Sequence, residues 1–453
     1  MQEQETVIVG AGLAGSLLAI YLARRGCRVS VYEKRPDMRR TDIPAGRSIN
    51  LALANRGMRA LAEVGLGEEV RRLLIPMRGR MLHSPDGELQ FQPYGQRPEE
   101  VIHSVSRAEL NKLMMDAAEA THGVKLNFGQ RCDDVDFETN TLHFTNESDG
   151  QGYRVTARTL LGADGAGSAI RRAMQQQLGV QASEEMLGHA YKELTIPPDL
   201  AGRHQMEPEA LHIWPRGGFM LIALPNLDGS FTVTLFLPRE GTPGFDQLAD
   251  ADRLTAFFRT HFADVVDKLP TLVEDFFTNP TGSLGTVRCR PWHHQGRVLL
   301  LGDAAHAIVP FHGQGMNCAF EDCLVLDRCL DAADGDWVRA FADYDQLRKL
   351  DADAIADMAL ENYVEMRDSV RDPGFRLRKE LGFELERRYP DRFIPRYSMV
   401  MFHHLPYAEA QERGAVQARI LKSLTEGVEN LSDVDWNEAD RLVNADLPVM
   451  PGD

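Results

Sequence analysis

Three glycine-containing motifs hold the residues whose types and spacing best suit the binding of a nucleotide. The first is Gly10-x-Gly12-x-x-Gly15, whose glycines allow a tight strand-to-helix turn and the close approach of a pyrophosphate to the backbone. The free N–H groups and the dipole of the following helix favour that anion. Glu33 follows at the spacing of about 20 residues expected for an acid that binds ribose hydroxyls. The motif predicts FAD or NAD rather than NADP, although alone it also fits a glycine-rich turn beside a surface glutamate.

The second motif is the run Gly-Ala-Asp-Gly-Ala-Gly-Ser at residues 162–168, which is followed by Arg171 and Arg172. A strand end, a flexible turn and a new helix with Ser168 at its N-cap would make another corner that is able to bind phosphate. Taken alone, this run also fits an ordinary turn.

The third motif is Leu-Gly-Asp-Ala-Ala-His at residues 301–306, continued by residues 310–317. Asp303 can accept a hydrogen bond from a polyol hydroxyl, such as those of the flavin ribityl chain. A long helix opens near Gly313 and Gly315, and its N-terminus would stabilise the negative charge that develops on the flavin pyrimidine edge during reduction. The three motifs in this order are more specific for a flavin dinucleotide than any one of them.

Short apolar runs supply the elements that must position these motifs. Residues 6–9 predict a strand that ends at the first glycine, residues 13–25 have apolar residues at helical spacing, and residues 28–33 alternate as a second strand. This is a β-α-β unit, the start of a doubly wound sheet. Residues 159–161 and 298–301 predict further strands of the same sheet, each ending at one of the other motifs.

Segments of another character interrupt this sheet. Residues 76–103 are rich in Pro, Gly and Gln, and residues 186–290 contain alternating runs at 210–214, 219–224 and 231–237, followed by helices near 246–262. We expect a mostly antiparallel second sheet. From residue 314 onward the chain is nearly all helical in pattern. The expected architecture is an α/β fold with a discontinuous Rossmann-like FAD-binding domain (1–75, 104–182 and 291–330), an inserted antiparallel substrate domain (76–103 and 183–290) and a helical C-terminal region (331–453).

Composition and charge exclude several functional classes. The 453 residues include 50 Lys and Arg against 67 Asp and Glu, a formal net charge of −17. This acidity argues against a nucleic-acid partner and against binding to anionic membranes by overall charge. No signal peptide, transmembrane run or membrane anchor is expected. Six cysteines without a C-x-x-C pair fit buried free thiols in a reducing cytoplasm. The sequence carries no indication of an oligomeric state.

The ordered set of three motifs resembles the single-component flavoprotein aromatic hydroxylases, the group A flavin monooxygenases. The resemblance implies bound FAD, a nicotinamide donor and O2 as cofactors, and the sequence fits because it has one dinucleotide fingerprint and no second one. No histidine spacing suggests a metal site. The residues that the family assigns to the cofactor match Gly10, Gly12, Leu13, Ala14, Gly15, Glu33, Lys34, Arg35, Arg107, Asp164, Asp303, Gly313, Gly315, Met316 and Asn317.

Within that group, the chain resembles the kynurenine 3-monooxygenase family, from about residue 5 to about residue 420. The segments that carry this likeness are 46–53, 77–81, 211–215, 231–236, 361–366 and 396–399. Eukaryotic members end in a membrane-anchoring segment, whereas this chain ends in the acidic stretch 433–453, so the bacterial form is the closer likeness. The acidic composition of that stretch is compatible with disorder.

The resemblance also places a substrate site. Arg80 would bind a carboxylate with its guanidinium fork, although without the resemblance a surface ion pair is the simpler interpretation of this arginine. His312 is the one titratable group in the predicted ring slot, and a packed histidine is a commoner role than a catalytic base. The implied substrate residues are Arg80, Tyr94, Asn362 and Tyr397 at the polar end, and Leu211, Ile222, Leu224, Phe236, Pro310, Phe311, His312 and Met366 around the ring.

The function implied is NADPH-dependent hydroxylation of L-kynurenine to 3-hydroxy-L-kynurenine through a flavin C4a-hydroperoxide, in tryptophan catabolism. NADPH as the donor rests on the resemblance alone. Three alternatives remain open from the residues. They are a related hydroxylase of another amino- or hydroxy-aromatic acid, a flavin-binding redox protein without turnover, and an NAD-dependent dehydrogenase. The last leaves the Gly-Asp-Ala-Ala-His segment unexplained.

Overall fold

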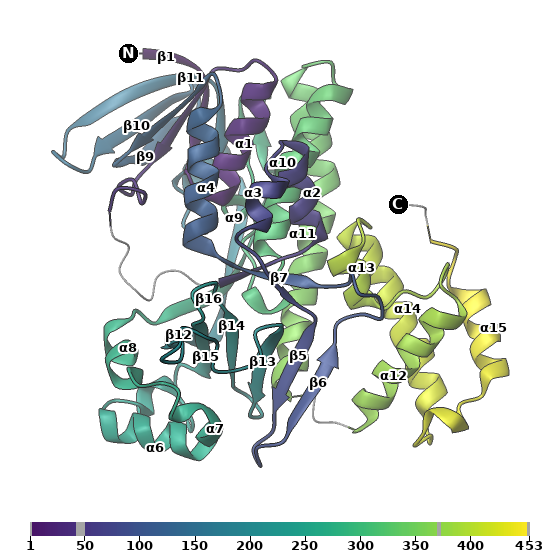
Figure 1. Ribbon diagram of the computed structural model, residues 1–453. Coiled ribbons are helices and arrows are strands. Elements are labelled where there is room, and N and C mark those ends of the chain that lie inside the picture. The colour runs from purple at the N-terminus through teal and green to yellow at the C-terminus, as the bar shows by residue number, and fades with distance from the viewer. Residues whose placement is uncertain (1, 42–49, 369–372, 451–453) are drawn as a thin grey trace. The chain divides into compact units, whose positions relative to one another are not determined.

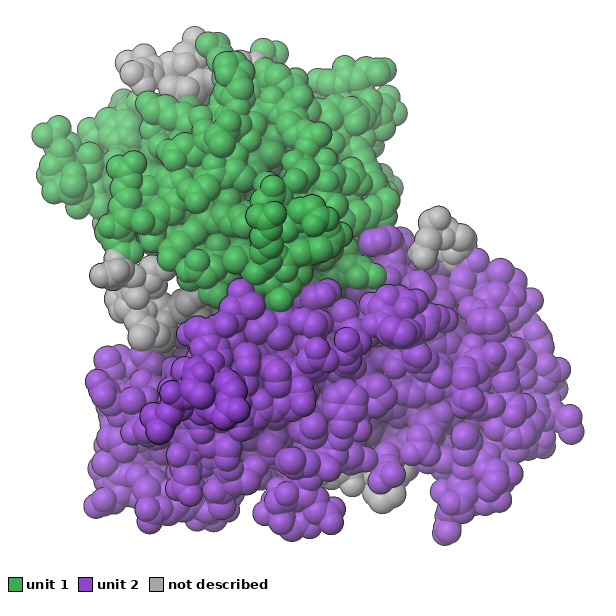
Figure 2. Space-filling view, in the orientation of Figure 1, with its two compact units in different colours: residues 1–74, 105–187, 283–356 green, residues 75–104, 188–282, 357–453 purple. Residues whose placement is uncertain are grey.

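The computed structural model describes residues 2–41, 50–368 and 373–450. Positions 46–49, which contribute to the resemblance above, lie outside the described residues. The chain forms two compact units, each assembled from three separate stretches (Figure 2). Unit 1 comprises 1–74, 105–187 and 283–356, and unit 2 comprises 75–104, 188–282 and 357–453. The helical region that the sequence analysis separated at residue 331 is shared in this division, because the chain changes units between residues 356 and 357.

Unit 1 is built on a mostly parallel sheet (Figure 1). β1 lies at its centre and pairs in parallel with β2 on one side and β11 on the other. β8 extends the parallel pairing beyond β2, and β18 extends it beyond β11. In spatial order the strands are β17 (His293–His294), β18 (Val298–Leu300), β11 (Gly152–Gly162), β1 (Gln2–Val9), β2 (Val29–Glu33) and β8 (Val124–Phe128). The hairpin β9 (Gln130–Asp136) and β10 (Thr141–Asn146) pairs antiparallel with β11.

The sequence of unit 1 explains this architecture. Val7, Ile8 and Val31 have no exposed surface, as expected for parallel strands that are covered on both faces. The helix after β1 buries Leu17 and Leu18 completely and packs against α4 and α10. The helices of this unit are α1 (Leu13–Arg24), α2 (Asn55–Glu63), α3 (Gly67–Arg71), α4 (Arg107–Ala120), α5 (Ala169–Leu178), α9 (Asp303–His306) and α10 (Gly315–Ala332). The predicted β-α-β start and the doubly wound class are confirmed.

Unit 2 contains most of a second sheet, of which β12 and β16 also run into unit 1. In spatial order its strands are β16 (Gly282–Arg290), β12 (Gln181–Ile196), β15 (Phe231–Pro238), β14 (Met220–Pro225), β13 (Ala210–Pro215), β5 (Gly79–His83) and β6 (Leu89–Pro93). The described pairings are antiparallel except for β13 with β5. The three predicted strands at 210–237 and the mostly antiparallel character are therefore confirmed. β3 (Asn50–Leu53), β7 (Ile102–Ser106) and β4 (Ile75–Met77) form a third sheet in this order, in which β4 and β7 pair antiparallel.

One face of this second sheet carries the core of unit 2. Trp214, Leu221 and Leu235 are fully buried there, together with aromatic residues of the helices that follow β15. These helices are α6 (Ala251–His261), α7 (Ala263–Val266) and α8 (Leu272–Thr278). The helices predicted near 246–262 are thereby confirmed for α6.

The chain from residue 314 onward is helical, as predicted. After α10 follow α11 (Trp337–Asp368), α12 (Pro373–Arg388), α13 (Arg396–Phe402), α14 (Tyr407–Thr425) and α15 (Trp436–Asp446). Among the described helices, none combines the length and the apolar character that a membrane crossing requires.

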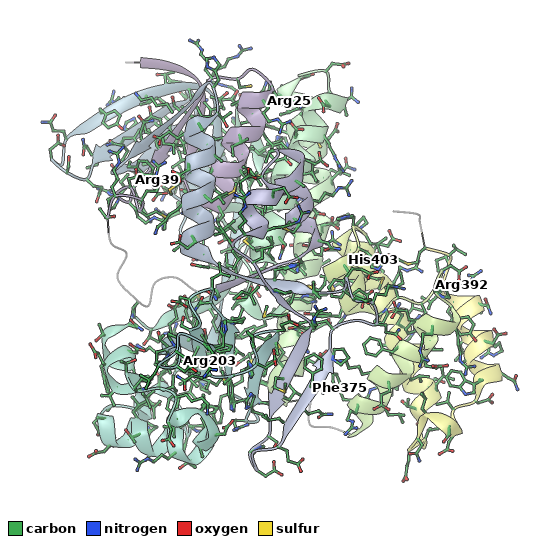
Figure 3. All side chains as sticks on the ribbon, in the orientation of Figure 1. Arg25, Arg39, Arg203, Phe375, Arg392 and His403 are labelled. Atoms are coloured by element: carbon green, nitrogen blue, oxygen red, sulfur yellow. The ribbon has the colours of Figure 1, made fainter. Side chains whose placement is uncertain are left out.

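The acidic C-terminal stretch is ordered over α15, so the expectation of disorder is wrong for these residues. The Asp435 carboxylate caps the helix by accepting from the N–H groups of the first turn. Ala439 and Val443 have no exposed surface and pack with α12 and α14 residues in a small apolar core. The Arg392 guanidinium, on a side chain that is labelled in Figure 3, also donates to the Leu447 carbonyl at 2.7 Å. Apolar packing on one helix face therefore outweighs the acidic composition of the stretch.

Candidate active site

The three glycine motifs meet at one edge of the unit 1 sheet. Val9 pairs with Gly162 on one side and with Tyr32 on the other, and Gly162 pairs with Leu300. All of these strands are parallel, so their carboxyl ends and the turns that follow them lie together. In open α/β sheets this is the edge at which ligands bind.

The first turn is shaped by close backbone contacts that exclude side chains. A Cβ on Gly10 would lie 2.3 Å from the Ala163 carbonyl oxygen, and one on Gly15 would lie 1.9 Å from the Gly10 carbonyl oxygen. Gly10 also has a φ of +104°, which other residues rarely adopt. A Cβ on Gly12, by contrast, would meet no atom of the described chain within 4 Å. The chain therefore needs glycine at 10 and 15 for its own packing, and has open space at 12.

Glu33 supports this turn directly. Its Oε2 accepts a hydrogen bond from the Ala11 N–H at 2.9 Å, and its Oε1 accepts from the backbone N–H and the Nε of Arg35. Burial alone would raise the pKa of Glu33, but these hydrogen bonds and the Arg35 charge lower it. The carboxylate is thus ionised at neutral pH and ties the end of β2 to the glycine turn. Lys34 and Arg35 are exposed beside it.

Asp164 of the second motif is turned inward. Its Oδ2 accepts from the Ala169 N–H at 2.6 Å, and Ser168 caps the same helix by accepting from the Arg171 N–H, which confirms the predicted N-cap. The Asp164 Oδ1 is buried and has no hydrogen-bond partner among the residues that the structure describes. Burial raises the pKa of this carboxyl group. An unsatisfied buried oxygen of this kind favours a donor from a ligand.

Arg171 joins the second motif to the third, a role that the sequence analysis did not assign. Its side chain is fully buried and donates to the Ala304 carbonyl at 2.8 Å and to the Glu184 carboxylate at 2.6 Å. It also donates to the carbonyl of Ala166 in the second motif. A guanidinium has donors in a fixed fork, so this single side chain fixes both turns at once.

A buried carboxylate holds the third motif in place from behind. Asp322 on α10 accepts from the Gly302 N–H at 2.9 Å and from His306 Nε2 at 2.6 Å through one oxygen, and from Arg348 Nε at 2.8 Å through the other. Burial alone would raise the pKa of Asp322, but His306 and Arg348 hold it well below its ordinary value. The network leaves Asp303, the next residue after Gly302, exposed at the edge of the sheet.

The same network contains the one group of side chains in the described chain with ligand atoms close enough to hold a metal ion. These atoms belong to His306, Cys318 and Asp322 and lie within 4.8 Å of one another. The Arg348 guanidinium, however, already donates to Asp322 and to Cys318 Sγ at 3.2 Å. Burial also keeps the pKa of the Cys318 thiol well above its ordinary value, so in this network the thiol is protonated. The cluster is best described as a buried ion-pair network.

The start of α10 presents free backbone N–H groups. Over the residues that the structure describes, no side chain caps this helix at Gln314. Asn317, predicted to touch the cofactor, is buried and committed to backbone. Its Nδ2 donates to the carbonyls of Ala52 and Gly313, and its Oδ1 accepts from the Ala54 N–H at 2.9 Å. Asn317 therefore fixes the Gly313 turn, and the N–H groups at Gly315 and Met316 open the helix.

These features of unit 1 fit a flavin dinucleotide. The helix after the first turn starts without a side-chain cap or an acid in its first turn, so its N–H groups are left for an anion. Gly12 has open space, Asp164 has an unsatisfied oxygen, and Asp303 is exposed. Arg107 is exposed at the start of α4. The contacts of the other predicted cofactor residues with FAD stay predictions.

In unit 2 the predicted ring-slot residues share one face of the sheet with Arg80. Arg80 on β5 pairs with Leu211 on β13, and Ile213, two residues further on, pairs with Ile222 on β14. Paired residues of neighbouring strands point to the same face, and side chains alternate along a strand. Leu211 and Ile222 are therefore on the Arg80 face, and both are partly exposed.

Leu224 and Phe236 belong to the same face. Leu224 lies two residues beyond Ile222, and Phe236 on β15 pairs with Met220, two residues before Ile222. None of the four predicted strand residues belongs to the core that covers the opposite face. The structure thus gathers an apolar surface beside a cation.

Arg80 is the centre of a buried polar cluster. Its side chain is only 7% exposed, and its NH1 lies 3.3 Å from the Glu365 carboxylate. Its guanidinium carbon lies 5.8 Å from the Tyr94 ring centroid and 5.1 Å from that of Tyr397, and the two rings stack at 5.4 Å. Arg80 Nε and the Tyr94 hydroxyl are buried and lack a hydrogen-bond partner of ordinary geometry within the described part of the chain. The predicted trio of Arg80, Tyr94 and Tyr397 is brought together.

Asn362 and Met366 lie on the helix face that reaches this cluster. Asn362 is 5% exposed and its Nδ2 approaches Met366 Sδ at 3.4 Å, one helical turn further on. Glu365, which pairs with Arg80, lies between them on the same side of α11. Glu365 was not among the predicted site residues, although it is part of the segment that carries the resemblance.

A second cation, Lys379 on α12, was also missed. Its Nζ lies 3.4 Å from the Oε1 of Gln92, which pairs directly with Arg80 across β5 and β6. Burial and the neighbouring Arg80 guanidinium lower the pKa of Lys379 to about 8. Nothing in the sequence near residue 379 indicates this position, because its neighbours come from strands almost 300 residues earlier.

The remaining predicted ring residues belong to unit 1. Pro310, Phe311 and His312 form a short 3₁₀ turn before α10, in which Phe311 and His312 are buried. Their part in the ring slot stays a prediction.

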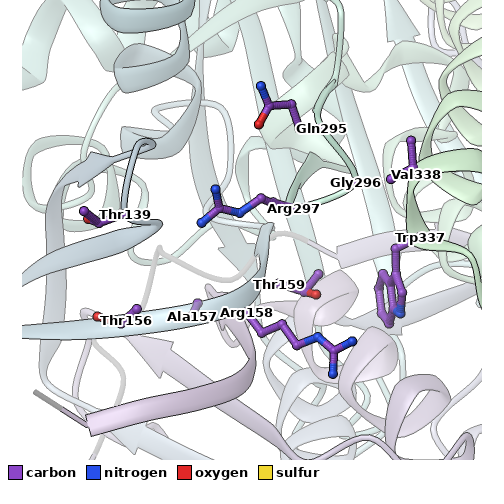
Figure 4. A pocket seen from close by; sticks show the side chains of 10 residues that line it. All are labelled: Thr139, Thr156, Ala157, Arg158, Thr159, Gln295, Gly296, Arg297, Trp337 and Val338. Atoms are coloured by element: carbon purple, nitrogen blue, oxygen red, sulfur yellow. The ribbon is translucent and has the colours of Figure 1, made fainter.

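A shallow pocket in unit 1 contains none of the predicted site residues (Figure 4). It is lined by threonines together with Arg158, Arg297 and Trp337. Arg158 and Arg297 precede the paired segments of β11 and β18, whereas the glycine motifs follow them. The pocket is therefore at the opposite end of these strands from the nucleotide edge.

Known proteins resemble this chain over almost all of its length. The FAD binding domain family matches residues 3–353. The kynurenine 3-monooxygenase of Myxococcus xanthus (strain DK1622) is 51% identical over 450 residues, which cover 99% of this chain and 97% of that protein. The kynurenine 3-monooxygenase of Stenotrophomonas maltophilia (strain K279a) is 49% identical over 445 residues, with 98% and 97% covered.

Solved structures of lower identity share the fold. The tetrameric form of 2-methyl-3-hydroxypyridine-5-carboxylic acid oxygenase has a TM-score of 0.66 at 18% identity, covering 82% of this chain and 95% of that one. The p-nitrophenol 4-monooxygenase PnpA of Pseudomonas putida DLL-E4 has a TM-score of 0.66 at 17% identity, covering 95% and 100%. Such identities support the architecture alone. The identities of about 50% over the full length, together with the match to the FAD binding domain family, show that the chain belongs to the kynurenine 3-monooxygenase family of FAD-dependent enzymes.

Proposed function

We propose that this protein is an FAD-dependent monooxygenase that uses NADPH and O2 to convert L-kynurenine to 3-hydroxy-L-kynurenine. The observation that carries the proposal is the buried Arg80 cluster beside an apolar sheet face, in a chain about half identical to curated kynurenine 3-monooxygenases over its whole length. L-kynurenine combines an α-amino acid with an ortho-aminophenyl ketone. The cation suits the carboxylate, and the apolar face suits the ring.

Arg80 is the residue that binds the substrate carboxylate. A guanidinium forms paired charge-assisted hydrogen bonds with a carboxylate, and these are strong where water is excluded. Arg80 Nε and the Tyr94 hydroxyl beside it are buried and have no hydrogen-bond partner of ordinary geometry among the described residues, although Arg80 and Tyr397 interact with that hydroxyl. Both groups are donors, so both suit the same carboxylate oxygen atoms.

The apolar face orients the ring and keeps water from it. Leu211 and Ile222 are the partly exposed members of that face, and Phe236 is buried beside them. A flat apolar surface holds an aromatic ring without fixing a charge, while the carboxylate contact fixes its direction. The ring carbon that is hydroxylated is the one adjacent to the carbon bearing the amino group. Holding this carbon in a reactive position is the main contribution of the protein to the reaction.

The nucleotide edge of unit 1 is the place for FAD. The free N–H groups at the starts of α1 and α10 and the exposed Asp303 would hold it. Bound FAD supplies the activation of O2 once NADPH has reduced it. We assign no side-chain base, and His312 stays the one titratable candidate in the predicted ring slot. A reducing compartment such as the cytoplasm is part of the proposal, because all six cysteines are free thiols.

The test is NADPH consumption in air by the purified protein loaded with FAD, with and without L-kynurenine. We expect L-kynurenine to increase the rate strongly. If another aromatic amino acid increased the rate and L-kynurenine did not, the chain would be a related hydroxylase. If no aromatic acid changed the rate, the proposal of a catalytic flavoprotein would be wrong.

A further inference from the structure

Among the residues that the structure describes, the Arg80 cluster contains more positive than negative charge. Its cations are Arg80 and Lys379, and its one carboxylate is Glu365, which is 3.3 Å from Arg80. Burial raises the pKa values of the Tyr94 and Tyr397 hydroxyls, so both rings are neutral at pH 7. A buried group with one surplus positive charge is unfavourable without a counter-ion. The site therefore suits a ligand that brings one negative charge to this end.

The contact that Lys379 makes with Gln92 places its ammonium group beside Arg80. Its Nζ is 3.4 Å from Gln92 Oε1, and Gln92 is the residue directly opposite Arg80 in the β5–β6 pair. An ammonium group has three donors, and this long contact is the one hydrogen bond of Lys379 in the described chain. On its own helix, Arg376 and Glu380 pair with each other at the exposed side. Within the described part of the chain, Arg80 and Glu365 are the charged groups that act on Lys379.

We propose that Lys379 is a second cation for the substrate carboxylate, which it binds together with Arg80. This inference rests on the proposed function and adds a residue that sets both affinity and specificity. Two cations favour an aromatic amino acid over the matching amine, because the amine carries only a positive charge and is repelled by both. Lys379 and Arg80 would thus each contribute to the preference for a substrate with a carboxylate over the matching amine.

The pH dependence follows from the sign of this charge. The pKa of Lys379, lowered to about 8 by burial and by Arg80, places its deprotonation just above neutral pH. The ammonium form binds a carboxylate and the neutral amine does not. Affinity for L-kynurenine is therefore complete below pH 8 and decreases as the pH rises through 8. An arginine at this position stays charged throughout and removes that decrease.

The experiment measures the dissociation constant of L-kynurenine from the FAD-loaded enzyme by the change in flavin absorbance, without NADPH, between pH 6.5 and 9.5. We expect K379M to weaken binding about tenfold at pH 7, as for one charge-assisted hydrogen bond. The dissociation constant of wild type should approach that of K379M as the pH rises. K379R should bind L-kynurenine with wild-type affinity at pH 7 and should lose less affinity than wild type at high pH. The matched control K422M removes an exposed lysine of α14 and should behave as wild type.

The amine analogue of kynurenine that lacks the α-carboxylate supplies the second readout. Its binding should be unchanged or strengthened by K379M, so that the preference for L-kynurenine falls at least tenfold. Equal affinity of wild type and K379M for L-kynurenine at pH 7 would overturn the role of Lys379 while leaving the proposed function intact. If K379M did not retain FAD, a K379R profile identical to wild type would overturn it as well. Failure of wild type to bind L-kynurenine would instead refute the proposed function itself.

Discussion

Replacement of Arg80 by alanine should remove most of the affinity for L-kynurenine while leaving the flavin bound. Arg80 is 5% exposed and its charge acts in a region from which water is excluded. A cation and a carboxylate about 4 Å apart attract each other by about 4 kcal/mol at an effective dielectric constant near 20. Truncating one partner of a desolvated, hydrogen-bonded charge pair costs about 2–5 kcal/mol in binding.

The cluster moves the expected effect to the lower half of that range. Lys379 keeps one positive charge close to the substrate and so limits the loss, although Glu365, left without its partner, repels the substrate carboxylate and offsets part of this benefit. We expect a loss of about 2–3.5 kcal/mol, which raises the dissociation constant roughly 30- to 300-fold. Because Arg80 lies in unit 2 and the nucleotide edge lies in unit 1, the FAD content should stay at the wild-type level.

The assay is a titration of the oxidised, FAD-loaded enzyme with L-kynurenine, followed by flavin absorbance. Arg78→Ala is the matched control, because Arg78 is half exposed and pairs with Glu209 at 2.7 Å on the surface. This control should leave the dissociation constant within a factor of two or so, as for other surface ion pairs. An unchanged affinity in Arg80→Ala, or an equal loss for the amine analogue without a carboxylate, would refute the assignment of Arg80 to the carboxylate.

Three further changes follow from the same geometry. Gly12→Ala should leave the FAD-free protein within about 1 kcal/mol of wild-type stability, because a Cβ there meets open space, yet lower FAD affinity at least tenfold as measured by equilibrium dialysis. Asp322→Asn breaks a buried ion pair, so urea unfolding at pH 7 should show a loss of about 3 kcal/mol and earlier flavin release. Burial alone would raise the pKa of Asp322, but His306 and Arg348 hold it low. The Asp322 carboxylate therefore stabilises the fold at neutral pH and stops doing so as it is protonated, so the loss caused by Asp322→Asn should become smaller below about pH 4. Burial lowers the pKa of His212 to about 4. As the pH falls from 7 to 4, the unfolded chain therefore binds a proton at His212 before the folded chain does, and the folded state loses stability. His212→Gln should reduce this loss by up to about 3 kcal/mol.

Each change has a control elsewhere in the chain. Gly15→Ala should prevent folding as well as FAD binding, because its Cβ would lie 1.9 Å from a carbonyl oxygen. Asp331→Asn removes a carboxylate that is 70% exposed and should have little effect on unfolding at pH 7. His122→Gln changes an exposed histidine and should keep the full pH dependence. Normal FAD affinity in Gly12→Ala, wild-type stability in Asp322→Asn or an unaltered pH slope in His212→Gln would each contradict the interpretation of that residue.

The nucleotide edge could be predicted from sequence because its signals are local. Gly10 and Gly15 mark a turn whose atoms lie within a few residues of one another along the chain, and Glu33 closes on Ala11 through a single β-α-β unit. The parallel pairing of Val9 with Gly162 brings the second motif to the same place without further information. Apolar strand runs and glycine turns were therefore sufficient to predict most of the fold of unit 1.

The supporting networks could not be predicted, because their partners are distant or have no motif of their own. Arg80 meets Glu365 across 285 residues of sequence, and Lys379 reaches Gln92 across 287. Arg348 and Asp322 each look like ordinary helix-surface charges until the packing of α10 and α11 buries both. Charge type alone does not reveal which ionic side chains become buried.

The acidic tail shows the opposite error, in which composition concealed a periodic signal. Trp436, Ala439, Val443 and Leu447 recur at spacings of three and four residues, as on one face of a helix. Asp435 is a good N-cap immediately before them. Counting charges over the stretch favoured disorder, whereas the spacing of its apolar residues predicts α15.

The most direct test of the central claim is turnover of L-kynurenine with NADPH under dioxygen labelled with the heavy oxygen isotope, followed by mass spectrometry of the product. The account predicts one labelled oxygen atom on the aromatic ring, next to the amino group, with consumption of one NADPH for each product molecule. NADPH consumption that yields hydrogen peroxide and unchanged L-kynurenine would contradict it, because the substrate would then stimulate the flavin without being positioned for hydroxylation. A product with unlabelled oxygen would equally contradict a monooxygenase reaction.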